Sequence, residues 1–148
     1  MPEPGVTLVK QPGQRKKPER KVRVLIADDH PIIRRIVRST LQANPRLEVC
    51  GEAENGAEAI EEAKKLKPDV VVLDVSMPVL NGFDSAREIK KTLPESAIVI
   101  LSQNADQHYV EEARKIGVQA YVAKARAGEA LVKAVEGAAL GDDFLLVD

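Results

Sequence analysis

Short apolar runs alternate along the chain with longer segments of mixed character. A short apolar run indicates a buried strand, whereas apolar residues that recur every three or four positions indicate a helix. The expected strands are Val22–Ala27, Arg46–Glu54, Val70–Leu73, Ala97–Leu101 and Gln119–Val122. The expected helices run from Pro31 to the Asn44-Pro45 pair and over Ala57–Leu66, Gly82–Lys91, Asp106–Ile116 and Ala127–Leu140.

This strand–helix alternation predicts a doubly wound α/β sheet. Val70–Leu73 is the most continuous apolar run, as is typical of a central parallel strand covered by helices on both faces. Residues 1–20 are rich in proline and basic residues, and we expect a flexible, solvated arm there. Residues 21–140 form the predicted domain, and residues 141–148 form a short tail.

Composition agrees with one domain and excludes several classes of protein. The chain has 148 residues, of which 44% are hydrophobic and 30% are charged, and its net charge of −1 gives no whole-chain attraction to nucleic acid or to a membrane. A lone cysteine, Cys50, excludes an internal disulfide, and no Cys/His cluster suggests zinc. His30 and His108 have no ligand-like partner in the sequence, although His30 borders the acidic residues described next. No apolar stretch is long enough to span a bilayer, so we expect a cytoplasmic protein.

Polar residues stand at the carboxyl ends of four predicted strands, where sheets of this kind place their binding sites. They are Asp28, Asp29, Asp74, Ser102 and Lys124. Carboxylates gathered at one edge repel one another unless a cation lies among them, and hard oxygen ligands favour Mg²⁺. A carboxylate that faces a phosphoryl donor can act as a nucleophile and form an acyl phosphate, while a lysine and a metal ion neutralise the transferring group.

Taken in order, these residues resemble the response-regulator receiver family over about residues 21–140. The shared pattern is Asp28-Asp29, Asp74-Val75-Ser76-Met77-Pro78 with Gly82, then Ser102, Tyr121 and Lys124. The opening Ile26-Ala27-Asp28-Asp29-His30-Pro31 is most similar to receivers of NarL/FixJ-type transcription regulators. The resemblance implies a flavodoxin-like (βα)5 fold with five parallel strands in the order 2-1-3-4-5.

The resemblance also implies a role for each matched residue at the metal site. Asp74 is the expected phosphoacceptor and a ligand of Mg²⁺. Asp29 would bind Mg²⁺ directly, and Asp28 would bind it chiefly through water. The backbone carbonyl of Ser76 would complete the ligands that the protein supplies.

Three further residues are expected to respond to the phosphoryl group. Lys124 would pair with it, Ser102 would turn toward it, and Tyr121 would act as the switch aromatic. The readout would be partner binding or homodimer formation through the face made by the fourth helix, the fifth strand and the fifth helix. The implied donor is a sensor histidine kinase or a phosphotransfer protein, and the chain is not expected to be an enzyme beyond its own phosphorylation and dephosphorylation. Direct binding to nucleic acid or to a membrane is not expected.

Three alternatives stand beside this prediction. The chain stops at Asp148, so it is either a single-domain regulator or the receiver piece of a DNA-binding regulator whose helix-turn-helix domain is absent. A phosphatase of the haloacid dehalogenase type needs an acid two residues after its nucleophile, and Ser76 stands there. A scaffold that no longer takes phosphate is disfavoured by the intact Asp29, Asp74 and Lys124.

Overall fold

A computed structural model describes residues 20–148 and contains a six-stranded parallel sheet in the order β2-β1-β3-β4-β5-β6. The strands are β1 (Val22–Ala27), β2 (Leu47–Ala53), β3 (Val70–Asp74), β4 (Ala97–Ser102), β5 (Ala120–Ala123) and β6 (Leu145–Val147). The helices are α2 (Pro31–Gln42), α3 (Gly56–Leu66), α4 (Gly82–Thr92), α5 (Gln107–Ile116), α6 (Ala127–Leu140) and the 3-10 turn η2 (Lys124–Arg126). The predicted N-terminal arm lies outside the described residues, except for Arg20, whose guanidinium donates two hydrogen bonds of 3.1 Å to Asp69.

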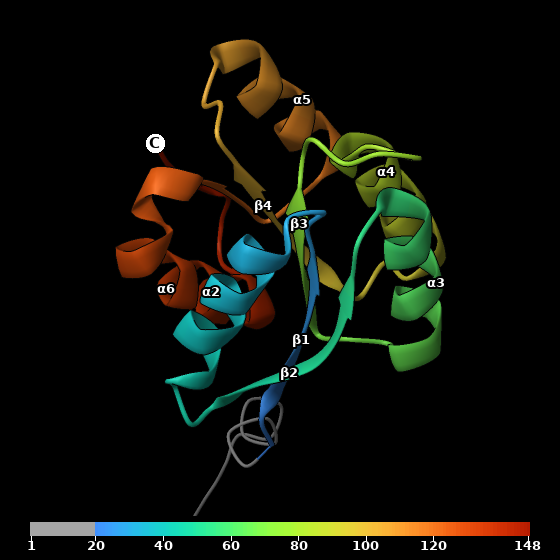
Figure 1. The fold of residues 1–148 in the computed structure, drawn as a ribbon. Coiled ribbons are helices and arrows are strands. Elements are labelled where there is room, and N and C mark those ends of the chain that lie inside the picture. The colour runs from blue at the N-terminus through green and yellow to red at the C-terminus, as the bar shows by residue number, and fades with distance from the viewer. Residues whose placement is uncertain (1–19) are drawn as a thin grey trace, which may run out of the picture.

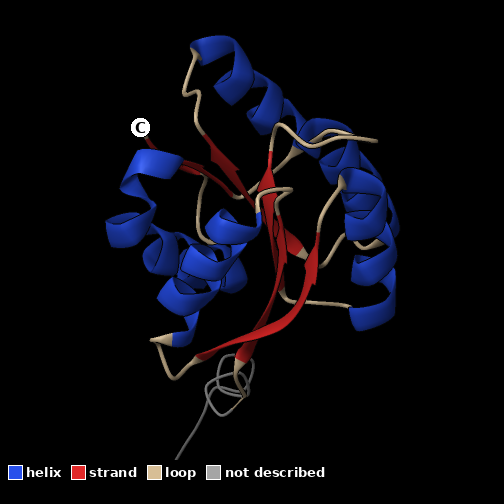
Figure 2. Ribbon diagram, viewed as in Figure 1, coloured by secondary structure: helices blue, strands red, loops and turns tan. Residues whose placement is uncertain are grey.

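Helices cover both faces of the sheet (Figures 1 and 2). In Figure 1, α2 and α6 lie on one side, and α3, α4 and α5 lie on the other. Successive residues of a strand point to opposite faces, so each strand supplies two apolar clusters. In β3, Val72 packs toward α2 and α6, whereas Val71 and Leu73 pack toward the opposite layer. Burial of both faces explains why β3 is apolar without a break.

Capping residues define one end of each of four helices. The side chains of Asn55 and Asn81 cap α3 and α4, each accepting a hydrogen bond from the backbone N–H three residues on, at 2.8 and 2.9 Å. Gly117 and Gly141 end α5 and α6 in the left-handed conformation, with φ of 96° and 82°. The strand order of the sheet confirms the predicted α/β class and the predicted order of the first five strands.

The sheet contains one strand more than the sequence predicted. β6 pairs in parallel with β5, with Leu146 opposite Tyr121, so the segment expected to be a tail extends the sheet. The guanidinium of Arg114 on α5 lies 4.8 Å from the centre of the Phe144 ring, just before β6. A strand of three residues is too short to show a period, and its pairing is determined by the open edge of β5.

Gly82 allows α4 to begin directly against the end of β3. A Cβ atom at this position would lie 2.2 Å from the carbonyl oxygen of Asp74 and 2.8 Å from the Cα of Val75. Both neighbours are backbone atoms, so they cannot turn aside as a flexible side chain could. Glycine at position 82 therefore fixes the distance between the first turn of α4 and Asp74.

We predict that Gly82→Ala lowers the free energy of unfolding by about 1–3 kcal/mol, because the added methyl group must push the backbone at Asp74 and Val75 apart. Urea titration followed by circular dichroism measures this loss. Gly128→Ala is the matched control, since a Cβ at position 128 meets no atom within 4 Å. The control should be neutral or stabilising by less than about 1 kcal/mol; equal losses in both variants would contradict the prediction.

Candidate functional site

The carboxyl ends of β1, β3 and β5 bring three of the predicted residues together around one ammonium group. Asp28 follows β1, Asp74 ends β3, and Lys124 begins the turn after β5. The Nζ atom of Lys124 lies 3.2 Å from Asp28 Oδ2 and 3.1 Å from Asp74 Oδ1. Both aspartates are almost fully buried, at 2% and 3% exposure. The lysine thus joins two buried carboxylates that come from different strands.

Two residues that sequence reasoning did not assign to the site also contact the acidic pair. His30 donates its backbone N–H to Asp28 Oδ1 at 2.8 Å, and its Nδ1 atom lies 3.1 Å from an oxygen of Asp28 and 3.1 Å from an oxygen of Asp29. Arg34 donates to the backbone carbonyl of Asp28 at 2.7 Å and pairs with Glu52 on β2 at 3.0 Å. The expectation that His30 has no ligand-like partner is therefore wrong. Its position directly after Asp28-Asp29 was the available signal.

Several carboxylate oxygens remain without a hydrogen bond although they are buried. Among residues 20–148, these atoms are Asp28 Oδ2, Asp29 Oδ1 and Asp74 Oδ2. The first lies within ion-pair distance of Lys124 and the second within that of His30, but their geometry is not that of a hydrogen bond. Asp74 Oδ2 has neither kind of partner in the described part of the chain. Buried anionic oxygens of this kind are costly unless a cation or a donor satisfies them.

Ser102 and Tyr121 meet at one backbone carbonyl beyond the end of β4. The Ser102 hydroxyl donates to the carbonyl oxygen of Asn104 at 3.1 Å and accepts from the Asn104 N–H at 3.0 Å. The phenol of Tyr121 donates to the same carbonyl oxygen. Burial raises the pKa of Tyr121, so the phenol keeps its proton and remains a donor. The two predicted switch residues are therefore connected through Asn104.

A tight turn at residues 78–80 shapes the loop after β3. Val75 accepts a hydrogen bond from the Gly82 N–H at 2.9 Å, which closes the loop onto α4. Leu80 donates to the Pro78 carbonyl at 2.7 Å, across Val79, whose φ is 69°. A branched residue in this three-residue turn is strained, and the side chain of Val79 is exposed.

Comparison with known proteins identifies the family. A sequence profile described as the response regulator receiver domain matches residues 24–136. The chain belongs to the response-regulator receiver family. It is 33% identical over 127 residues to the transcriptional regulatory protein DegU of Brevibacillus brevis, covering 86% of this chain and 54% of that protein. It is 41% identical over 102 residues to the chemotaxis protein CheY of Thermotoga maritima, covering 69% of this chain and 84% of that protein.

Solved structures agree with this family. The receiver domain of the putative response regulator NarL from Mycobacterium tuberculosis superimposes with a TM-score of 0.78 at 34% identity, covering 82% of this chain and 98% of that domain. This receiver spans little more than half the length of the first curated relatives that it matches. Receivers are signalling modules of two-component systems. Within residues 20–148 of this one, no helix has the length and apolar character that a membrane span requires.

The electrostatics of the receiver site favour a proton or a cation at Asp74. Burial is the main cause that raises the pKa of Asp74, and the charge of Asp28 adds to it. Lys124 and the backbone N–H of Ser76 act in the opposite direction but do not cancel the shift. Burial alone would lower the pKa of Lys124, but the two aspartates together outweigh it and raise that pKa. The charged form of Lys124 is therefore favoured, whereas ionisation of Asp74 is less favourable in the folded protein than in water.

The same residues fit a divalent cation. Donor atoms of Asp28, Asp29, His30 and Asp74 all lie within 4.8 Å of one another. Three of the four residues offer carboxylate oxygens, the ligands that Mg²⁺ prefers. The buried oxygens without hydrogen bonds would gain a partner from such an ion. The acidic cluster of this receiver can thus hold a metal ion.

The raised pKa of Asp74 predicts how stability depends on pH. Between the ordinary value of 3.8 and the raised value, the folded protein holds a proton that the unfolded chain has released. Stability therefore falls as the pH rises through this window. We expect Asp74→Asn to be more stable than the wild type at pH 7 by on the order of 1 kcal/mol, because the buried charge is removed. The difference should shrink as the pH is lowered toward 3.8.

Thermal or urea unfolding in the presence of EDTA measures this difference without a divalent cation at the site. Asp143→Asn removes an exposed carboxylate outside the acidic cluster and serves as the control. It should leave the profile of stability against pH unchanged. A destabilised Asp74→Asn protein at neutral pH would refute the assignment of an unfavourable charge to Asp74.

Proposed function

We propose that this receiver accepts a phosphoryl group on Asp74 and uses the resulting change to alter its binding to a partner or to a second copy. The observation that carries the proposal is the environment of Asp74. One of its carboxylate oxygens pairs with Lys124 at 3.1 Å, and the other is buried without a hydrogen-bond partner among residues 20–148. No hydrogen bond occupies the lone pairs of that oxygen, which supports a role as a nucleophile.

The chemistry follows from the residues around Asp74. A carboxylate oxygen of Asp74 forms a bond to phosphorus, and the bond between phosphorus and the nitrogen of the donor's phosphohistidine breaks. The leaving imidazole takes up a proton from solvent. Lys124 is already beside Asp74 and can neutralise the charge of the transferring group. Its second contact, with Asp28, keeps the ammonium in place before the donor arrives. Burial of Asp74 excludes water that would compete with the donor.

We further propose that Mg²⁺ is bound by Asp28, Asp29, Asp74 and the backbone carbonyl of Ser76. When bound, the ion would neutralise the carboxylates and polarise the phosphoryl group. Asp28 and Asp29 come from the loop after β1, and Arg34 holds that loop by its hydrogen bond to the Asp28 carbonyl. Arg34 therefore acts as a positioning residue for the acidic pair.

The readout that we propose runs through Ser102 and Tyr121. If the Ser102 hydroxyl turns to an oxygen of the phosphoryl group, it must leave the Asn104 carbonyl, to which Tyr121 also donates. Asn104 lies in the loop between β4 and α5, so this exchange changes the support of α5. The affected surface is α5, β5 and α6, which corresponds to the face predicted from the sequence. A sensor histidine kinase or a phosphotransfer protein is the proposed donor, and a homodimer through this face is a proposed product.

A second candidate is that this chain is the receiver of a DNA-binding regulator. The relatives named as transcriptional regulatory proteins favour it, because the chain matches only 54% and 56% of their lengths. Phosphorylation of Asp74 would be the first step in a single-domain regulator and in a DNA-binding regulator alike. The two candidates differ in the segment that follows the receiver, and the length of the gene product distinguishes them.

Phosphorylation of Asp74 can be tested with a small acyl phosphate as the donor. We expect the wild type and Asp143→Asn to gain one phosphoryl group in the presence of Mg²⁺, detected by intact-mass spectrometry, and Asp74→Asn to gain none. Adding EDTA should reduce the reaction by at least about tenfold, since the charge of the transferring group is then less well neutralised. Undiminished modification of Asp74→Asn would overturn the assignment.

The readout is tested separately by amide NMR spectra recorded with Mg²⁺ and beryllofluoride, a mimic of the phosphoryl group. We expect shifts that begin at Asp74 and Ser102 and extend over α5 and the start of α6. Shifts confined to the acidic cluster would contradict the proposed switch, and no response at all would favour a scaffold that does not take phosphate. Ser102→Ala should bind the mimic yet reduce the shifts in α5.

A further inference from the structure

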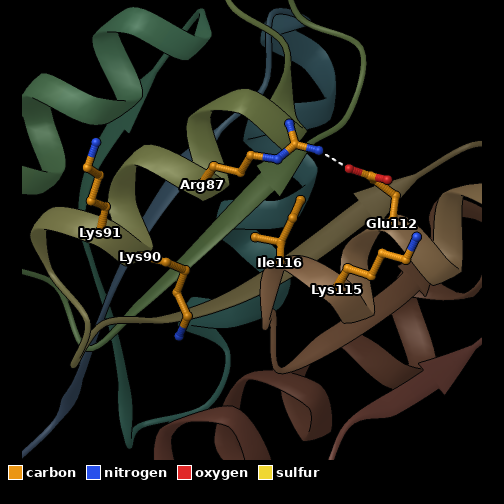
Figure 3. Close-up of a pocket in the computed structure, with 6 residues that line it drawn as sticks. All are labelled: Arg87, Lys90, Lys91, Glu112, Lys115 and Ile116. Atoms are coloured by element: carbon orange, nitrogen blue, oxygen red, sulfur yellow. Dashed lines mark hydrogen bonds and ion pairs between the residues drawn. The ribbon is translucent and has the colours of Figure 1, made fainter.

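A groove of about 410 Å³ lies between α4 and α5, and its lining is predominantly basic (Figure 3). α4 supplies Arg87, Lys90 and Lys91, and α5 supplies Glu112, Lys115 and Ile116. Four cations thus face one carboxylate, although the chain as a whole carries a net charge of −1. None of these side chains belongs to the acidic cluster at the carboxyl edge of the sheet.

One of the four cations is already neutralised within the protein. Arg87 forms an ion pair with Glu112 across the groove, drawn as a dashed line in Figure 3, and a second ion pair with Asp84 at 2.8 Å. The pair with Glu112 joins α4 to α5 at one side of the groove, whereas the pair with Asp84 lies within α4. Arg87 is therefore part of the wall of the groove and has little charge left for a ligand.

The three lysines have no ion pair with a carboxylate among residues 20–148. The Nζ atom of Lys90 lies 3.5 Å from the neutral Oε1 of Gln119, and burial lowers the pKa of Lys90. Lys91 and Lys115 are exposed. In Figure 3, the lysine side chains are spread around Ile116 rather than converging on one point. The like charges repel across the groove, and an anion placed there would relieve that repulsion.

The helix dipoles alone do not explain why basic residues line the groove between α4 and α5. Lysines at a helix C-terminus complement its partial negative charge, and Lys64 and Lys65 occupy the last turn of α3 in the same way. The ends of α4 and α5 differ because their basic side chains line one shared groove with an apolar residue, Ile116, between them. This combination suits an extended ligand that carries several negative charges and an apolar side chain.

We propose that the groove between α4 and α5 binds an acidic peptide segment of a partner protein, with glutamate or aspartate side chains on Lys91 and Lys115 and an apolar side chain over Ile116. Nucleic acid fits less well, because no aromatic residue lines the groove to stack on bases. This site is separate from the phosphorylation that we propose at Asp74.

Binding is tested with a fluorescein-labelled peptide of sequence Glu-Glu-Leu-Glu-Glu and the whole chain, by fluorescence anisotropy at low salt. The matched peptide Gln-Gln-Leu-Gln-Gln and an oligothymidylate serve as the other two ligands. We expect saturable binding of the glutamate peptide, weaker binding at higher salt, and amide NMR shifts at Lys91, Lys115 and Ile116. No saturable binding, or equal binding of the glutamine peptide, would overturn the proposal. Tighter binding of oligothymidylate at the same amides would assign the groove to nucleic acid instead.

Two double variants distinguish binding at the groove from a general effect of the protein's charge on peptide binding. Lys91→Glu with Lys115→Glu should weaken binding of the glutamate peptide by about tenfold or more, because two attractive charges become repulsive. Lys64→Glu with Lys65→Glu makes the same change of charge at the end of α3 and should alter binding less than about twofold. Equal losses of peptide affinity in both variants would refute the proposal that the groove is the binding site. Circular dichroism verifies folding, and phosphorylation by the acyl phosphate should be unchanged in both.

Discussion

Two buried carboxylates near one another cannot both stay ionised without a cation between them, and the arrangement of this receiver depends on that constraint. Asp28 follows β1 and Asp74 ends the neighbouring strand β3, and Lys124 reaches both from the turn after β5. The three side chains meet because β1, β3 and β5 run in parallel and end at the same edge of the sheet. The connections through helices on both faces make that common edge possible.

One ammonium group is not enough for the acidic cluster. Asp74 has a raised pKa despite its contact with Lys124, and buried oxygens remain without hydrogen bonds in the described chain. The folded protein therefore keeps an electrostatic deficit at this site, and its stability elsewhere must compensate for it. A proton, a divalent cation or a change in the charge of Asp74 can each relieve the deficit. A site in that condition responds strongly to small changes in what it binds, which is what a signalling module requires.

The sequence predicted what depends on periodicity and strand ends, and it missed what depends on packing. The apolar runs located five strands, and Asp28, Asp74 and Lys124 at their ends indicated one site. The contacts of His30 could have been anticipated from its place beside Asp28-Asp29. The contact of Arg34 with the Asp28 carbonyl could not, because it requires the rotation of α2 and the position of β2. The basic groove could not be predicted from the sequence either, because its lining residues come from two separate helices, α4 and α5.

Because β6 pairs with β5, the strand that carries Tyr121 is an interior strand of the sheet and not its edge. Without β6, β5 would be the last strand of the sheet and would present a free row of backbone donors and acceptors to any neighbouring chain. With β6 in place, Tyr121 lies on an interior strand, and Leu146 stands beside it at the border. Removing the residues after Leu140 would thus expose the unpaired backbone edge of β5 beside Tyr121. Self-association seen in a protein shortened in this way would report the exposed backbone of β5 and not a signalling dimer.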